Sequence, residues 1–343
     1  MSGRTPSDTT RSGCSSTAFL SRRRLLAGAV GAATLAAALP GRAALPVAAD
    51  DLAGQLTYLV TDGQRTLIDI AVERDLGILS ISAVNPGVDV WIPGPERLVT
   101  LPTAYVLPEY ERRGIIVNLA EFRLYYFPTP DAPPIVHTIG IGRDGFSTPL
   151  GPTTVVRKQA NPTWYPTEST RADRPELPSA VPSGPDNPLG LFALYLGFPT
   201  YLIHGTNKPY GVGRRVSRGC IRMYPSGVAS LFQQVPVGTP VRIMDDPIKL
   251  GWSAGELFIE VHPDTEQFDQ LEVDYRFTKK PPPDVSPRII AKAGAEADRL
   301  AWDVIERELV NRRGIPVQIT RPAMANVESR SKSNIPTGFT GLY

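Results

Sequence analysis

The chain has 343 residues, and its formal net charge of +2 with 20% charged residues argues against a polyelectrolyte surface for nucleic acid. Its length allows about two or three domains with at least one sizeable core. The 35 prolines and 30 glycines indicate many turns, which favours a β-rich, exported protein over a helical bundle.

Residues 1–49 are predicted to be an export signal. Residues 21–26, Ser-Arg-Arg-Arg-Leu-Leu, precede an apolar run over 27–39. That run is too short to span a bilayer, which needs about 20 apolar residues. A serine before paired arginines favours a twin-arginine (Tat) signal over an ordinary secretory one. Cleavage after residues 47–49, Val-Ala-Ala, would start a periplasmic mature chain near Asp50, with no transmembrane span.

Removal of the signal leaves one thiol in the mature chain. Of the two cysteines, Cys14 lies before the apolar run and is lost, so Cys220 remains. No internal disulfide can then form. A lone cysteine in an exported protein is a candidate nucleophile, and an inert buried thiol is the alternative.

Residues 54–102 have the pattern of a small βααβ domain. A strand is predicted at 57–60, followed by the turn Asp62-Gly63 and a helix capped by Thr66. A second helix over 78–84 ends at Asn85-Pro86-Gly87, and a strand over 97–102 closes the unit.

Residues 112–246 read as a mainly β domain, a sandwich or barrel with one small helix. The long proline-rich stretch 161–188 has the composition of a loop or lid beside a cleft. The other predicted elements are strands at 115–119, 122–127, 135–141, 153–156, 195–196, 201–204 and 241–244, and a helix at 226–234. The remainder, 247–343, is predicted to be a C-terminal extension with one helix over 289–310 and a disordered end from Asn326.

The segment 201–224 carries the chemistry. His204 ends a predicted strand and a glycine- and arginine-rich loop leads to Cys220. An imidazole can take the proton of a thiol and return it to a leaving group. Gly219 permits a tight backbone whose N–H groups could face an oxyanion. Arg222, two residues after Cys220, could hold a substrate carboxylate and favour the thiolate.

A metal site is not expected. Three or four ligands would be needed, and the mature chain offers one cysteine and the three histidines His137, His204 and His262. His137 lies within a strand pattern and His262 beside a proline, so both are interpreted as structural. No cofactor is implied.

The segment from His204 to Met223 resembles the active-site signature of YkuD-type L,D-transpeptidases. Further matches upstream are Leu107-Pro108, 114–119, 140–143, 148–151 and 161–164. The βααβ unit resembles a LysM domain, a peptidoglycan-sugar binding module. The usual Gly-Asp-Thr-Leu turn of that domain is replaced here by Gly-Gln-Arg-Thr-Leu at residues 63–67. The order of the two domains matches the periplasmic branch of the family.

This resemblance implies a peptidoglycan crosslinking enzyme. Cys220 would attack the carbonyl between diaminopimelate and the terminal D-alanine of a tetrapeptide stem. A diaminopimelate amine would then resolve the thioester to a 3→3 crosslink, or a lysine of an outer-membrane lipoprotein would. His204 is implied as base, the Gly205 carbonyl as its orienting group, and the Gly219 and Cys220 N–H groups as the oxyanion hole.

The resemblance further implies that several polar and aromatic residues contact substrate: Arg222, Ser217, Arg218, Asn207 and Trp164. Many members have histidine at position 218; here Arg218 is interpreted as a tolerated variant that adds positive charge near the thiol. Two other functions stay open. One is an L,D-carboxypeptidase, in which water accepts the acyl group, and the other is a silent wall-anchoring protein that works through its LysM-like unit.

Overall fold

The computed structural model describes residues 50–322. The predicted export signal at 1–49 and the predicted disordered end from Asn326 lie outside the described residues. Among residues 50–322, no helix combines the length and the apolar character needed to cross a bilayer.

The N-terminal unit has the predicted βααβ order. It comprises β2 (Thr57–Asp62), α1 (Leu67–Glu73), α2 (Ile78–Val84) and β3 (Pro95–Leu101), and β2 pairs antiparallel with β3. Thr66 begins α1 through a capping box with Asp69, which satisfies two backbone donors at the helix start. The flanking strands β1 (Leu52–Gly54) and β4 (Ala104–Val106) pair with each other, so the chain enters and leaves the unit side by side.

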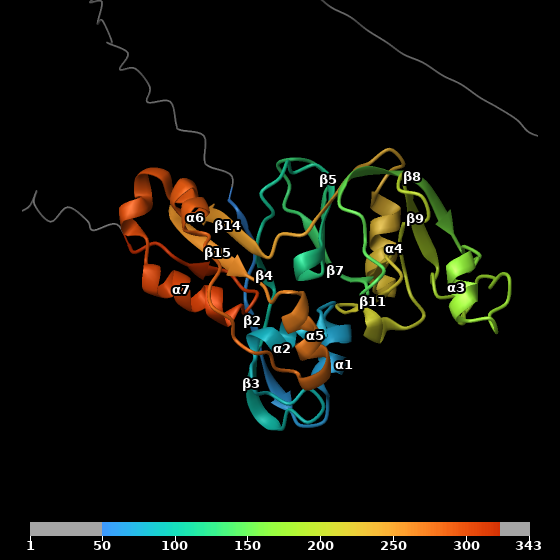
Figure 1. The fold of residues 1–343 in the computed structure, drawn as a ribbon, viewed down its shortest axis with the longest axis horizontal. Coiled ribbons are helices and arrows are strands. Elements are labelled where there is room, and N and C mark those ends of the chain that lie inside the picture. The colour runs from blue at the N-terminus through green and yellow to red at the C-terminus, as the bar shows by residue number, and fades with distance from the viewer. Residues whose placement is uncertain (1–49, 323–343) are drawn as a thin grey trace, which may run out of the picture. The chain divides into compact units, whose positions relative to one another are not determined.

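A closed nine-stranded sheet forms the centre of the protein, as the mainly β prediction required (Figure 1). Its strand order is β11-β7-β12-β10-β9-β8-β13-β5-β6, and β6 pairs back to β7 to close it. The bounds are β5 (Gly114–Asn118), β6 (Arg123–Phe127), β7 (Ile135–Gly142), β8 (Gly151–Ala160), β9 (Phe192–Leu196), β10 (Leu202–His204), β11 (Arg215–Ser217), β12 (Ile221–Met223) and β13 (Pro240–Met244).

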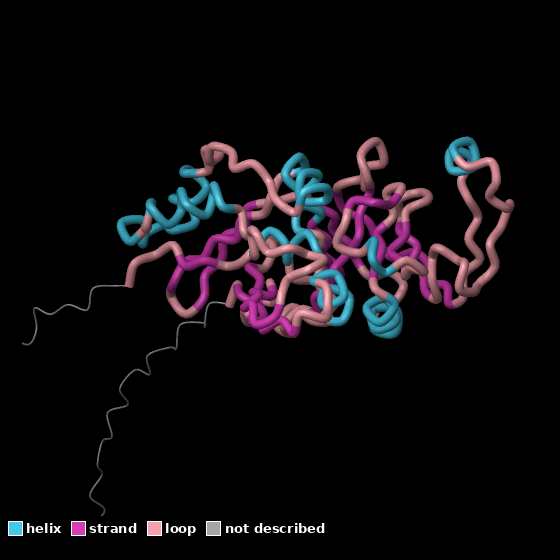
Figure 2. Tube along the Cα trace, turned by 90° about the horizontal axis from the view of Figure 1, so that it is seen from below, coloured by secondary structure: helices cyan, strands magenta, loops and turns pink. Residues whose placement is uncertain are grey.

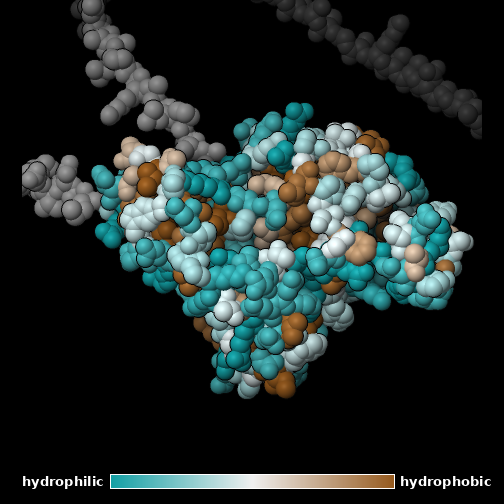
Figure 3. Space-filling view, viewed as in Figure 1, coloured by the Kyte–Doolittle hydropathy of each residue, from teal (hydrophilic) through white to brown (hydrophobic). Residues whose placement is uncertain are grey.

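Two helices and two short 3₁₀ turns accompany the sheet. Helix α4 (Pro225–Gln234) follows the nucleophile segment and buries Val228 and Leu231. Helix α3 (Glu168–Asp173) lies in the loop between β8 and β9, which projects beyond the ends of these strands (Figures 1 and 2). The 3₁₀ turns are η1 (Leu119–Glu121) and η2 (Pro209–Gly211). Apolar residues gather in the middle of the face drawn in Figure 3, where Figure 1 shows β5 and β7.

The prediction of a single helix over 289–310 in the C-terminal extension is wrong. It contains β14 (Ile248–Ser253), β15 (Glu256–Val261) and β16 (Val317–Gln318) in one sheet, with α5 (Thr265–Asp274), α6 (Ser286–Ala293), η3 (Gly294–Arg299) and α7 (Trp302–Asn311). The predicted helix is interrupted because Gly294 has φ +55° and Leu300 is extended. Its apolar positions are buried in both helices, so the pattern alone did not reveal the interruption.

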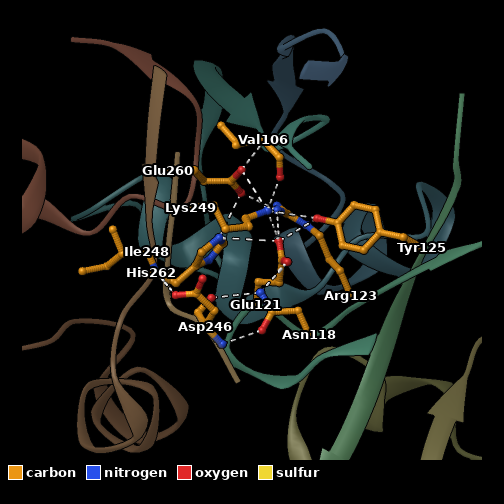
Figure 4. Close-up of polar contacts among 10 residues, drawn as sticks. All are labelled: Val106, Asn118, Glu121, Arg123, Tyr125, Asp246, Ile248, Lys249, Glu260 and His262. Atoms are coloured by element: carbon orange, nitrogen blue, oxygen red, sulfur yellow. Dashed lines mark hydrogen bonds and ion pairs between the residues drawn. The ribbon is translucent and has the colours of Figure 1, made fainter. Parts of the chain in front are cut away.

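A buried ion cluster joins the extension to the closed sheet. Glu121 and Glu260 share the cations Arg123 and Lys249: Arg123 lies 2.8 Å from Glu121 and 2.5 Å from Glu260, and Lys249 lies 2.6 Å and 3.1 Å from them. His262 Nε2 lies 2.9 Å from Glu260 Oε1 (Figure 4). Two carboxylates and a histidine could in principle ligate a metal ion, but here two side-chain cations already neutralise the carboxylates.

Candidate active site

Two short parallel strands bring the thiol and the imidazole to one surface. Strands β10 and β12 are parallel neighbours, and their register sets His204 beside Arg222. Cys220 immediately precedes β12 and therefore lies beside Leu202, whose N–H donates to the thiol. Because residues two apart on a strand face the same side, Cys220, His204 and Arg222 share one face of the sheet.

His204 is buried and held in one tautomer. The residue is only 4% exposed, and its Nδ1 donates to the Gly205 carbonyl at 2.6 Å. Burial and then the charge of Arg222 lower the pKa of His204 to about 4, against the opposing effect of the Gly205 carbonyl. At neutral pH the ring is therefore neutral, and with Nδ1 carrying the proton, Nε2 keeps a lone pair that can accept one.

Cys220 is a neutral thiol in this environment. Burial raises its pKa, while the Leu202 N–H and the Arg222 charge act in the opposite direction without overcoming it. Its Sγ also lies 3.5 Å from the carbonyl oxygen of Thr200. A base is needed to remove the thiol proton, because the pocket does not stabilise the thiolate enough to form it unaided.

The backbone before the thiol is fixed by short hydrogen bonds. Gly219 has φ +98°, and a methyl group at this position would lie 2.8 Å from Cε1 of Tyr201. The Gly219 carbonyl accepts from Thr148 Oγ1 at 2.8 Å. Ser217 Oγ donates to the Cys220 carbonyl at 2.6 Å and accepts from the Gly219 N–H at 3.1 Å. The Gly219 N–H expected in the oxyanion hole is thus engaged by Ser217, which leaves the Cys220 N–H as the candidate donor.

Arg222 is a cation without an acidic partner in the described part of the chain. It is half-buried, no ion pair of residues 50–322 includes it, and its Nε is a buried donor with no acceptor. Burial lowers the pKa of its guanidinium, although arginine remains charged at neutral pH. A buried donor without an acceptor is costly, so this guanidinium suits an anionic ligand beside the thiol.

The other predicted substrate residues belong to the loop 161–188 or touch it. Arg218 forms an ion pair with Asp173 of α3 and lies over the Phe146 ring, with 4.4 Å from its Cζ to the ring centroid. Asn207 donates to the Pro185 carbonyl at 3.2 Å, and Trp164 exchanges two backbone hydrogen bonds with Val181. Apart from the Phe146 ring, these contacts are all made with residues of the loop itself.

Sequence reasoning missed two groups at this site. Asp173, the partner of Arg218, gives no local signal because 45 residues separate them. Tyr201, whose hydroxyl donates to the Ser147 carbonyl at 3.3 Å, was seen only as a strand residue. The motif at 148–151 is part of the family resemblance, and its residue Thr148 donates a hydrogen bond to the Gly219 carbonyl.

A cavity of about 370 Å³ lies beside Thr148 and Arg215, close to the loop that leads to Cys220. It opens between the closed sheet and the extension, and neither Cys220 nor His204 lines it. Its lining includes apolar residues of the core and a rim of polar groups: Phe122, Ile141, Thr148, Arg215, Asp245 and Phe268. Thr148 connects this cavity to Gly219, so the cavity borders the site without containing its chemistry.

Known proteins are similar to this chain over the part that carries His204 and Cys220. Residues 112–243 match the family model of YkuD, the L,D-transpeptidase catalytic domain. The chain is 41% identical over 285 residues to "Probable L,D-transpeptidase ErfK/SrfK" of Escherichia coli strain K12, with 80% of this chain and 90% of that protein aligned. It is 38% identical over 290 residues to the protein of the same name in Salmonella typhimurium, with 82% and 92% aligned.

A third relative is "Probable L,D-transpeptidase YbiS" of Escherichia coli strain K12, 37% identical over 284 residues, with 80% of this chain and 90% of that protein aligned. The alignments extend well beyond the catalytic region into the flanking parts of the chain. The chain therefore belongs to the YkuD-type L,D-transpeptidases, enzymes that use a cysteine nucleophile on peptidoglycan.

Proposed function

We propose that this L,D-transpeptidase works in the periplasm with Cys220 as nucleophile and His204 as base. One observation carries the assignment. The thiol, a neutral imidazole with a lone pair on Nε2 and an unpaired guanidinium, that of Arg222, share one strand face. Those three groups are what a cysteine acyl transfer to and from an anionic peptide requires.

The first half-reaction releases D-alanine. Arg222 binds a carboxylate of the stem peptide, and His204 Nε2 accepts the Cys220 proton as the sulfur attacks the diaminopimelate carbonyl. The oxyanion faces the Cys220 N–H. When the carbon–nitrogen bond breaks, the imidazolium gives its proton to the leaving amine, and a thioester remains.

The second half-reaction uses an amine as acceptor. A diaminopimelate amine attacks the thioester, His204 takes its proton, and the proton returns to the departing thiolate. The product is a 3→3 crosslink. A lysine amine of an outer-membrane lipoprotein would follow the same steps, because both acceptors present a primary amine. The N-terminal unit would bind the glycan strands that carry these stems, as a LysM-like module. Export would follow the Tat route.

The decisive experiment incubates the purified protein with tetrapeptide muropeptides and reads the products by mass spectrometry. Crosslinked dimers with loss of D-alanine are expected, and Cys220→Ala should form none. Tripeptides without dimers would instead identify a carboxypeptidase. Unchanged tetrapeptides, together with a peptidoglycan pull-down that survives Cys220→Ala, would identify a wall-anchoring protein and refute the proposal.

The acyl-enzyme can be observed directly. A carbapenem should add its mass to the native protein and not to Cys220→Ala. A second comparison, His204→Gln, keeps a polar side chain but removes the base. We expect its acylation to fall by about 10²–10⁴-fold, the usual contribution of general base catalysis. A native protein that stays unmodified would count against the mechanism.

A further inference from the structure

A short turn of the N-terminal unit contacts the nucleophile segment at two places. The turn, residues 75–77, connects α1 to α2 and lies outside the matched catalytic region. Tyr224, four residues after Cys220, donates its hydroxyl to the Leu76 carbonyl at 3.0 Å. Both residues are buried, so this hydrogen bond is shielded from water.

The second contact joins two glycine backbones. A methyl group on Gly213 would lie 2.4 Å from Cα of Gly77, and Gly213 has φ +75°. Such a separation leaves no room for a side chain, and the left-handed conformation also favours glycine. The loop that leads to the thiol is therefore in direct contact with the start of α2.

The loop residues next to Gly213 also lie close to Arg222. The Gly213 N–H donates to the Ile139 carbonyl at 3.2 Å, which ties the loop to β7. A methyl group on Gly211 would lie 3.5 Å from Nη1 of Arg222. Residues 211–213 thus lie between the N-terminal unit and the unpaired guanidinium of the site.

The same turn also holds the strand beside β12. Thr138 Oγ1 donates to the Asp75 carbonyl at 2.7 Å, and Thr138 lies on β7. The register of β7 with β12 sets Gly140 beside Arg222. Two contacts from one turn therefore reach the segment that carries the thiol and the guanidinium, and a third reaches the strand beside it.

The loop is also held by α5 of the C-terminal extension. Arg214 forms an ion pair with Glu272, and Arg215 lies 3.2 Å from Asp269. Neither α5 nor the turn belongs to the matched catalytic region. The loop before Cys220 is consequently held by two elements that lie outside the matched catalytic region.

We propose that the turn 75–77 is a positioning element for catalysis, acting through Tyr224 on the thiol and through Gly213 on Arg222. This inference rests on the proposed function. Tyr224 and Gly213 are positioning residues, since neither touches the reacting atoms. The N-terminal unit is then part of the catalytic machinery, in addition to any role in binding the cell wall.

The first test compares two tyrosine hydroxyls of the full-length enzyme. Tyr224→Phe removes the bond to Leu76, and Tyr126→Phe removes a matched bond to the Gln234 carbonyl, also 3.0 Å long. We expect carbapenem acylation to slow about 10-fold in Tyr224→Phe. Removing an oxyanion donor completely costs about 10²–10³-fold in rate, and displacing the donor should cost part of that. Tyr126→Phe should keep the wild-type rate even where its melting temperature falls equally.

The second test compares two left-handed glycines. Gly213→Ala forces the loop away from Gly77, whereas Gly238, with φ +91°, has nothing within 4 Å of an added methyl group. We expect Gly213→Ala to raise KM for the tetrapeptide stem about 10-fold with little change in kcat, because a charged hydrogen bond from Arg222 is weakened. Gly238→Ala should leave KM unchanged.

Amide hydrogen exchange distinguishes this inference from the proposed function. Peptides covering 213–224 should exchange faster in Tyr224→Phe than in Tyr126→Phe, whether or not the enzyme is active. Equal acylation and equal exchange in the two tyrosine variants would overturn the positioning role. A wild-type protein that forms no acyl-enzyme would overturn the proposed function instead, and the exchange comparison would still decide the positioning role.

Discussion

Titration of Cys220 tests the neutral thiol–imidazole pair that the site predicts. The perturbation is pH, and the probe is the far-ultraviolet absorbance of the thiolate in the native protein minus that of Cys220→Ala, which cancels the absorbance of all other groups. Burial, opposed by the Leu202 N–H and Arg222, raises the pKa of Cys220 above its ordinary value of 9.0. The thiolate fraction at pH 7 should therefore be below about 1%.

The imidazole sets the other half of this prediction. Burial and the charge of Arg222 lower the pKa of His204 from 6.5 to about 4, a difference that corresponds to about 3 kcal/mol. Acylation should thus be nearly independent of pH between about 5 and 8 and should fall as His204 becomes protonated near pH 4. The same shift makes folding less favourable as pH falls from 6.5 toward 4, because the unfolded chain binds this proton first.

A thiolate–imidazolium pair would give the opposite spectrum. Its thiolate absorbance would already be present at about pH 6 and would disappear only on further acidification. That result would refute the reasoning from burial. Acylation rates alone would not separate the two states, since both lose activity in acid. The difference spectrum separates them, because only the ion pair contains a thiolate at neutral pH.

Three further changes have defined outcomes. Gly219→Ala places a methyl group 2.8 Å from Tyr201 and should slow acylation about 10²–10³-fold by displacing the Cys220 N–H, with a near-native melting curve as control. Glu260→Gln leaves cations of the buried ion cluster uncompensated and should cost about 3–5 kcal/mol of stability, or about 10 °C in Tm; an unchanged Tm would contradict it. Asp173→Asn should speed proteolysis within 161–188, because it removes the ion pair to Arg218; wild-type cleavage rates would disprove that role.

The fold was predictable where local pattern and burial coincide. The βααβ order, seven of the nine strands of the closed sheet and α4 follow from alternation, caps and turn residues, whereas the short strands β11 and β12 were not predicted. The extension was not, because Gly294 interrupts a helix whose apolar positions remain correctly spaced. The strands over 248–261 were also missed. They form a hairpin across the two-residue turn at 254–255, and the attachment of this hairpin to the closed sheet depends on contacts distant in sequence, such as Arg123 with Glu260, which are 137 residues apart.

The site was predictable in its members but not in its electrostatics. His204 and Cys220 lie in one segment, and the spacing of Arg222 placed it on the same face of an extended chain. The expectation that an arginine favours the thiolate holds for Arg222 only as a partial effect, since burial of the thiol outweighs it. Burial is set by the whole fold, so the residues could be predicted from the sequence but their protonation states could not.

The resemblance to the family leads us to expect histidine at position 218 in many members, and here the position is occupied by Arg218. A guanidinium cannot act as a base at any physiological pH, so the proposed mechanism assigns proton transfer to His204. The guanidinium is instead paired with Asp173 and lies over the Phe146 ring. Its charge is thereby offset, and Arg222 is the arginine whose charge acts on Cys220. In this structure Arg218 therefore holds the loop 161–188 beside the thiol through its ion pair with Asp173.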